Sequence, residues 1–460
     1  MSSFNAGSAD AHADANSPRA LNAEAKRIGP WSASQEARVR AGAPQTVARE
    51  KRNLIIRLPD ELLSAIFLAV PNAVGHAFAL AGTCRWWRAV ALSLPHLWAR
   101  VNCVLEDTAD AAAQGRWAGY LRTHLARAGS ILLDARLEYS CDGYFSGDLR
   151  AAVLAVWQRS ERFELVTSLE FDRLTEDDPF DFLRAHAPHL VDLRVDQTMQ
   201  LDSDDRAALE LALRAPKLKK FAFGGAMLVF DPDFDGAAAV MEAEVLVDFL
   251  DGDALPDLFA CFPHLEKLHL FMSCDLLANS VVHSDRLLAM RLQLPSGTIN
   301  QTTADTLRFP SLLAAYVHIM ESHTLKPDVI RSFMSNALGN VLMLHLHFDL
   351  VPGFAEGIAV CTRLRHLVLR SILIPITDAD EPVALVEALG SADRLTGSWP
   401  CPQLETITIH GKMTESVFAQ KLVALAEARR ALTVPISRIE VEGFDALQNR
   451  LNEILGSGAE

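Results

Sequence analysis

A chain of 460 residues, half of them hydrophobic, can bury a large core and has room for two or three domains. Its formal net charge of -15 argues against a general nucleic-acid-binding protein, because such a protein needs a basic surface. No apolar run reaches the roughly 18 residues of a membrane span, and the first residues lack the apolar core of a signal peptide. We therefore expect a cytoplasmic or nuclear protein that binds neither nucleic acid nor membrane.

The first segment, residues 1–52, is rich in alanine, serine and scattered charges. Such a segment buries too little apolar surface to offset the entropy cost of ordering, so we predict that it is largely disordered. The composition changes at Asn53, where aliphatic and aromatic residues become frequent.

Residues 54–104 predict three short helices. The first begins at Pro59, because proline fits the first turn of a helix, and it ends before Pro71. The second runs through residues 77–81, and Thr83 is the expected cap of the third. Three short helices in about 50 residues make only a marginal core, which is typical of a docking module that needs a partner.

This segment resembles an F-box. The patterns LPDELL…IF, C-R-x-W-R-x-V-A and P-x-L-W occur in that order between Leu58 and Trp98. The resemblance implies docking on a Skp-type adaptor and, through it, on a cullin–RING ubiquitin ligase. In the family, apolar residues of the first and the tryptophan-containing helix contact the adaptor. Carried over to this chain, they are Leu58, Pro59, Leu62, Leu63, Ile66, Cys84 and Trp87. The same residues could instead form the core of the module itself.

A six-residue pattern with aliphatic side chains at positions 1, 4 and 6 recurs through residues 166–445. The repeats begin at Val166, Leu190, Leu218, Leu265, Leu287, Leu312, Val341, Leu364, Leu404 and Ile436. Each predicts a strand with one buried face. Helical patterns lie between the strands, most clearly at residues 204–215, 327–338, 382–389 and 415–431.

This alternation of strands and helices indicates an irregular α/β solenoid with a parallel sheet. The pattern resembles leucine-rich repeats, although it lacks their usual asparagine. We expect a connecting segment at residues 105–165 and a C-terminal tail at 446–460. An F-box followed by loose repeats, α+β overall, resembles the large F-box-like sets of mushroom-forming fungi.

Positions 3, 5 and 7 of each strand should point away from the core. In the first repeats they hold Ser168, Glu170, Asp192 and Arg194; in the later ones they hold Lys267, His269, Phe271, Arg291, Tyr316, His318, His345, His347, His366, Arg370 and His410. Six of the fifteen histidines fall on this strip. It predicts a basic, aromatic surface for a protein substrate, with tighter binding of an acidic partner near pH 6 than near pH 8. The alternative is ordinary solvated strand surface.

No motif predicts catalysis, a cofactor or a metal. Residues 231–242 match a calcium-loop pattern, but strand-like residues stand where its entering helix belongs, so an acidic surface loop is favoured. His345 and His347 lack a third zinc ligand. The seven cysteines form no CxxC pair, which favours buried free thiols.

The sequence therefore predicts a substrate-recruiting adaptor of an SCF-type ubiquitin ligase and not an enzyme. Its expected partners are a Skp-type adaptor, the cullin–RING core and an unknown protein substrate. The alternative is a repeat-based protein-binding scaffold whose F-box-like module acts independently of a ligase.

Overall fold

The computed structural model describes most of residues 58–456. The gaps are residues 71–74, 106–109, 140–144, 168–180, 198–202, 228–233, 235, 238, 250–253, 274, 295–298, 320–325, 349–353, 371–379, 393–398, 411–416, 431, 433–434 and 443. The predicted disordered segment, residues 1–52, lies outside the described residues. The chain divides into two compact units, Met1–Ala69 and Val70–Glu460.

The first unit contributes helix α4 (Asp60–Ala69), which begins after Pro59 as predicted. Asp60 and Glu61 lie in its first turn, where negative charge favours the positive end of the helix dipole. Leu63 and Phe67, one turn apart, are each only 1% exposed. Leu62 and Ile66 lie on the adjacent face and stay 53% and 45% exposed. The helix therefore has one buried and one exposed apolar stripe.

The second unit begins with helices α5 (His76–Thr83), α6 (Arg85–Leu92) and α7 (Pro95–Trp98). The prediction that Thr83 caps the third helix was wrong, because Thr83 belongs to α5 and its hydroxyl donates to the Ala79 carbonyl. Cys84 is the cap, and its Sγ accepts a hydrogen bond from the Trp87 amide at 3.4 Å. The buried Trp98 indole joins α7 to α6 by donating to the Ala91 carbonyl at 2.8 Å.

Thirteen parallel strands follow in one open sheet, and neighbours in the sheet are neighbours in the chain. They are β1 (Arg100–Leu105), β2 (Leu133–Tyr139), β3 (Ser160–Thr167), β4 (Asp192–Gln197), β5 (Lys220–Met227), β6 (Glu242–Phe249), β7 (Lys267–Met272), β9 (Ala289–Leu294), β11 (Ala314–Ile319), β12 (Met343–Phe348), β13 (His366–Arg370), β14 (Thr406–His410) and β15 (Arg438–Val441). Two short strands, β8 (Val282–His283) and β10 (Leu307–Arg308), pair separately.

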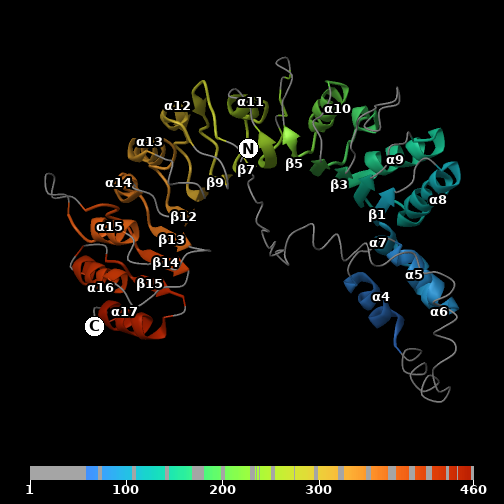
Figure 1. Ribbon diagram of the computed structural model, residues 1–460. Helices are drawn as coiled ribbons and strands as arrows, with labels where there is room; N and C mark the ends of the chain where they lie inside the picture. The colour runs from blue at the N-terminus through green and yellow to red at the C-terminus, as the bar shows by residue number, and fades with distance from the viewer. Residues whose placement is uncertain are drawn as a thin grey trace, which may run out of the picture. The chain divides into compact units, whose positions relative to one another are not determined.

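Helices between the strands lie along one side of this sheet (Figure 1). They are α8 (Ala111–Ala128), α9 (Gly147–Arg159), α10 (Ser203–Leu213), α11 (Ala254–Cys261), α12 (Gln301–Thr306), α13 (Pro327–Ala337), α14 (Phe354–Ala359), α15 (Asp380–Leu389), α16 (Val417–Arg430) and α17 (Asp445–Gly456), with a 3₁₀ turn η1 (Asp181–Arg184). The core lies between the two layers, and there Leu193, Leu344 and Leu367 are fully buried. The predicted α/β solenoid with a parallel sheet is confirmed.

Three features differ from the sequence prediction. The repeat at Val166 was placed wrongly, because the strand there is β3, which begins at Ser160. Residues 105–165 are not a connecting segment, since β1 and β2 already belong to the sheet. Most of residues 446–460 are not a tail but helix α17, whose Leu451 is buried. No helix in the described part is long and apolar enough to span a membrane.

Candidate functional site

The candidate site is the helix-free face, the side of the sheet opposite the helices. Side chains reach this face from alternate residues of each strand. The strands pair in register, so these side chains form rows that run across the sheet, with neighbours about 5 Å apart. We call them the first, second and third rows; on β4 they contain Asp192, Arg194 and Asp196.

The first row is a charge ladder in which positive and negative side chains alternate on seven successive strands. Its members are Arg100, Asp134, Arg162, Asp192, Lys220, Glu242 and Lys267. Arg162 lies 3.3 Å from Asp192 and 4.0 Å from Asp134. Glu242 forms ion pairs with two cations, since Lys220 lies 3.1 Å and Lys267 3.8 Å from its carboxylate. Each of the three carboxylates of the ladder is therefore paired with a cation of a neighbouring strand.

The second row starts with the same alternation but breaks at β5. Arg136 pairs with Glu164 at 2.9 Å, and Arg194 follows on β4. The next position holds Ala222, which has no side chain to pair with Arg194. Beyond it, Glu244 on β6 meets only a histidine, His269, at 3.5 Å. The break leaves Arg194 without an ion pair among the described residues.

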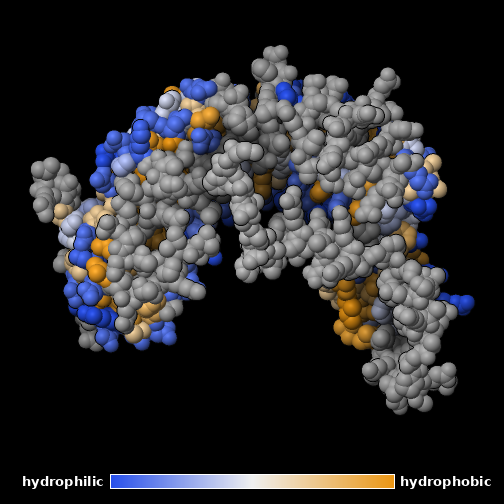
Figure 2. Space-filling model, in the orientation of Figure 1, coloured by the Kyte–Doolittle hydropathy of each residue, from blue (hydrophilic) through white to orange (hydrophobic). Residues whose placement is uncertain are grey.

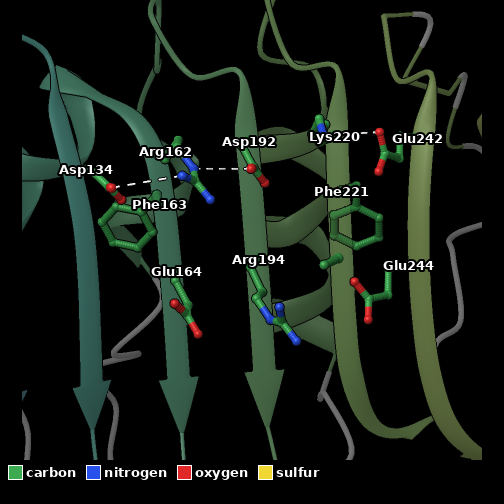
Figure 3. Close-up of a pocket in the computed structure, with 11 residues that line it drawn as sticks. Asp134, Arg162, Phe163, Glu164, Asp192, Arg194, Lys220, Phe221, Glu242 and Glu244 are labelled. Carbon is green, nitrogen blue, oxygen red and sulfur yellow. Dashed lines mark ion pairs between the residues drawn. The ribbon is translucent and has the colours of Figure 1, made fainter. Parts of the chain in front are cut away.

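A hollow of about 220 Å³ opens at this break. It lies over strands β2 to β6, and the charged side chains stand around its rim (Figure 3). Five carboxylates line it: Asp134, Glu164, Asp192, Glu242 and Glu244. Three cations do so as well: Arg162, Arg194 and Lys220. The remaining lining residues are uncharged: Phe163, Phe221 and Ala222. Sequence reasoning named only Asp192 and Arg194 here, because the pairing appears only once the strands are aligned.

From β9 onward the face changes character. From β9 to β12 the first row carries no charged residue and holds Ala289, Ala314 and Met343. Arg291 and Tyr316 are neighbours in the second row, and the guanidinium carbon lies 4.7 Å from the ring centroid. Such cation–π contacts are worth about 0.5–1 kcal/mol at exposed sites. This part of the face is aromatic and only weakly charged.

A histidine cluster lies beside Tyr316. His318 and His347 are neighbours in the third row and stack with ring centroids 4.0 Å apart. The Tyr316 hydroxyl lies 3.1 Å from Nδ1 of His347, and its ring lies 5.9 Å from that of His345. The sequence predicted these four residues on one surface, and the structure brings them together.

Two imidazoles of the cluster, His345 and His347, have lowered pKa values. Burial, followed by the charges of His318 and Arg370, lowers the pKa of His347 to about 4. Burial and the neighbouring His410 and Arg370 also hold the pKa of His345 below its ordinary value. The expectation that clustered imidazoles gain charge near pH 6 therefore does not hold for His347.

The other predicted strip residues are spread over three rows and do not form a single line. Lys267 is part of the ladder, and His269 lies 3.1 Å from Gln293. His366 is in the first row and contacts Thr406 at 2.8 Å. His410 contacts Glu442 at 2.8 Å. Arg370 lies between His347 and His410 in the third row, and its side chain is exposed. Ser168 and Glu170 lie outside the described residues.

The second candidate surface is the predicted adaptor-binding set. The structure leaves Leu62 and Ile66 exposed, and hydrophobic side chains gather over α4 (Figure 2). Leu63 is buried on the same helix face as Phe67, so the alternative that it belongs to the core of the module stays open beside the predicted adaptor contact. The remaining members are graded in exposure: Pro59 and Cys84 are exposed, and Leu58 and Trp87 are half-buried.

The last ligand position of the calcium-loop pattern, Glu242, lies in the sheet. Glu242 is the first residue of β6 and pairs with two lysines of the ladder. The aspartates at 231, 233 and 235 lie outside the described residues. Within the described ranges, no group of three or more His, Cys, Asp or Glu side chains is arranged to hold a metal ion.

Comparison with known proteins assigns the N-terminal module. Residues 55–104 match the F-box-like family. A search of curated proteins found no match. Among solved structures, the chain is similar to one in the crystal structure of a Rad7 and Elc1 complex in yeast. The identity is 12%, the TM-score is 0.34, and the match covers 84% of this chain and 96% of that one. A likeness this weak carries no functional information. The chain thus contains an F-box-like domain at residues 55–104, followed by an open α/β solenoid.

Proposed function

We propose that this protein is a substrate-recruiting adaptor of an SCF-type cullin–RING ubiquitin ligase. The observation that carries the proposal is the F-box-like domain at residues 55–104 together with the exposed pair Leu62 and Ile66 on α4. Large aliphatic side chains half exposed on one helix face are unfavourable in water and suit a protein partner. A Skp-type adaptor is the proposed partner, and the cullin–RING core joins through it.

The solenoid is the proposed substrate-binding domain, in the manner of leucine-rich repeats. Its helix-free face presents the cation–π pair of Arg291 and Tyr316 beside the histidine cluster. Arginine and tyrosine are enriched among the residues that dominate protein interfaces. The first row at β9 to β12 carries small or apolar side chains, so a partner chain can approach the sheet there without displacing charges.

The adaptor contact is tested with the double substitution Leu62→Ala with Ile66→Ala. Both side chains are exposed, so the fold should persist. Interface anchors cost about 2 kcal/mol or more on truncation, so we expect affinity for a purified Skp-type adaptor to fall at least ~30-fold. Trp87→Ala should also weaken binding. The measurement is isothermal titration calorimetry with the full chain, with circular dichroism of each variant to check folding.

The matched control is Val281→Ala with Leu288→Ala, which removes two exposed aliphatic side chains from the solenoid. It should bind the adaptor like the wild type. Wild-type affinity in the folded α4 variant would contradict the proposed contact. No adaptor binding by the wild type would instead favour a scaffold whose F-box-like module acts without a ligase.

A further inference from the structure

The hollow on the helix-free face lies where the second-row residue of β5 is small. That residue is Ala222, whereas the first-row residue of the same strand, Lys220, lines the hollow with its long side chain. The third-row residue of β5 is Gly224, so a second small residue follows Ala222 on this face of the strand. The gap between the charged side chains of β4 and β6 is therefore set by Ala222.

Two charges of opposite sign face this gap, and neither has a permanently charged partner among the described residues. On one side, Arg194 forms no ion pair with any described residue, because Glu164 is engaged by Arg136 and Asp192 by Arg162. On the other side, Glu244 has only an imidazole, His269, beside it. Figure 3 shows Arg194 and Glu244 on either side of the strand that carries Phe221.

The size and charge of the hollow limit what can occupy it. Its volume of about 220 Å³ is below the roughly 300–1,000 Å³ of pockets that hold small-molecule ligands. It suits one or two side chains of a protein segment. Five carboxylates against three cations would repel a multiply charged anion such as a phosphate group. A ligand that brings one negative and one positive charge meets no such penalty.

We propose that the hollow binds an extended segment of a protein partner that carries an acidic and a basic side chain two residues apart. The acidic group pairs with Arg194, whose planar guanidinium matches a carboxylate, and the basic group pairs with Glu244. The two pocket residues lie two strands apart, about 10 Å, and side chains at alternate residues of an extended chain lie about 6.6 Å apart on one face. The long, flexible side chains close the remaining distance. This site is independent of the F-box-like domain.

The test is an array of immobilised decapeptides probed with the full-length protein. One neutral host sequence carries Glu-x-Lys, Glu-x-Gln, Gln-x-Lys or Gln-x-Gln at its centre. The wild type should retain Glu-x-Lys about 2- to 5-fold better than either singly charged peptide, since an ion pair with an exposed side chain contributes a factor of that size. Retention should also fall with added salt.

Two variants separate the halves of the site. Arg194→Gln should lose the preference for Glu over Gln but keep the preference for Lys. Glu244→Gln should do the opposite. Ala222→Gln fills the hollow without changing its charge and should weaken all charged peptides alike. The control is Arg438→Gln, an exposed first-row cation on β15, which should behave like the wild type. Equal retention of all four peptides by the wild type, or unchanged preferences in both charge variants, would overturn the proposal.

Discussion

His347 shows how its position on a strand sets the chemistry of a side chain. Its imidazole is only 6% exposed, stacks on His318 and contacts the Tyr316 hydroxyl. In the unfolded chain the same imidazole has a pKa near 6.5, whereas burial in the folded state lowers its pKa to about 4. Between these values the unfolded chain binds more protons, so the contribution of His347 to stability is lost as the pH falls from about 6.5 towards 4.

We therefore predict that His347→Gln reduces the acid sensitivity of the fold. On lowering the pH from 7.5 to 5.0, the wild type should lose more stability than the variant, by on the order of 1 kcal/mol. Thermal unfolding of both proteins at the two pH values measures this difference. A matched His283→Gln variant, which changes an exposed histidine, should behave like the wild type. Parallel pH profiles for wild type and His347→Gln would contradict the assignment.

At the scale of elements, helix α17 protects an edge of the sheet. β15 pairs only with β14, so its outer backbone groups need other partners. Gln448 of α17 supplies two of them: its Oε1 accepts from the Val441 amide at 2.7 Å, and its Nε2 donates to the Ile439 carbonyl at 2.8 Å. One amide side chain thus takes the place of a further strand.

Gln448→Ala should lower the free energy of unfolding by about 1–2 kcal/mol, because it loses two hydrogen bonds to the edge strand and an exposed one to Asn452. Unpaired edge groups also favour strand-to-strand association, so light scattering should show more self-association at high protein concentration. Urea denaturation checks the first effect. The neighbouring Asn449 is exposed, and Asn449→Ala should change neither quantity. Identical behaviour of the two variants would rule out edge protection by Gln448.

The elements also show how far sequence reasoning reaches. The repeated pattern located the strands from β4 onward, apart from β6 and the two-residue strands β8 and β10, because leucine, valine or isoleucine fill most of their core positions. β2 and β6 were not located and carry Ala135 and Ala243 at the central core position, although β11 was located with Ala315 there; β3 was misplaced because Ser160 opens it. The histidine cluster was found from positions within single strands. The hollow was not, because it depends on which residue of one strand lies beside which residue of the next.

At the scale of the whole solenoid, each strand contacts only its neighbours in sequence. Such an architecture is stabilised repeat by repeat, and terminal repeats have one neighbour fewer. First-row ion pairs link most pairs of neighbouring strands from β2 to β7. The first row from β9 to β12 has small or apolar residues instead. The C-terminal repeats should therefore open more readily than the centre.

Native-state hydrogen exchange measures this gradient. We expect amides of β15 to exchange before those of β12, and those of β6 and β7 to exchange last. The Gln448→Ala variant should accelerate exchange in β15 and β14 and leave β6 unchanged. Uniform protection across all strands would show that the solenoid unfolds as one cooperative unit.

The charge ladder constrains how this half of the protein can change in length. Each rung from β1 to β7 has the opposite sign to its neighbours, so removing one repeat joins two rungs of equal sign; loss of the β4 repeat would set Arg162 beside Lys220. Like charges directly opposite one another are destabilising, by up to about 1 kcal/mol. Removing or duplicating two consecutive repeats restores the alternation. Growth and loss of repeats in this region should obey a parity rule, with even steps tolerated and odd steps penalised.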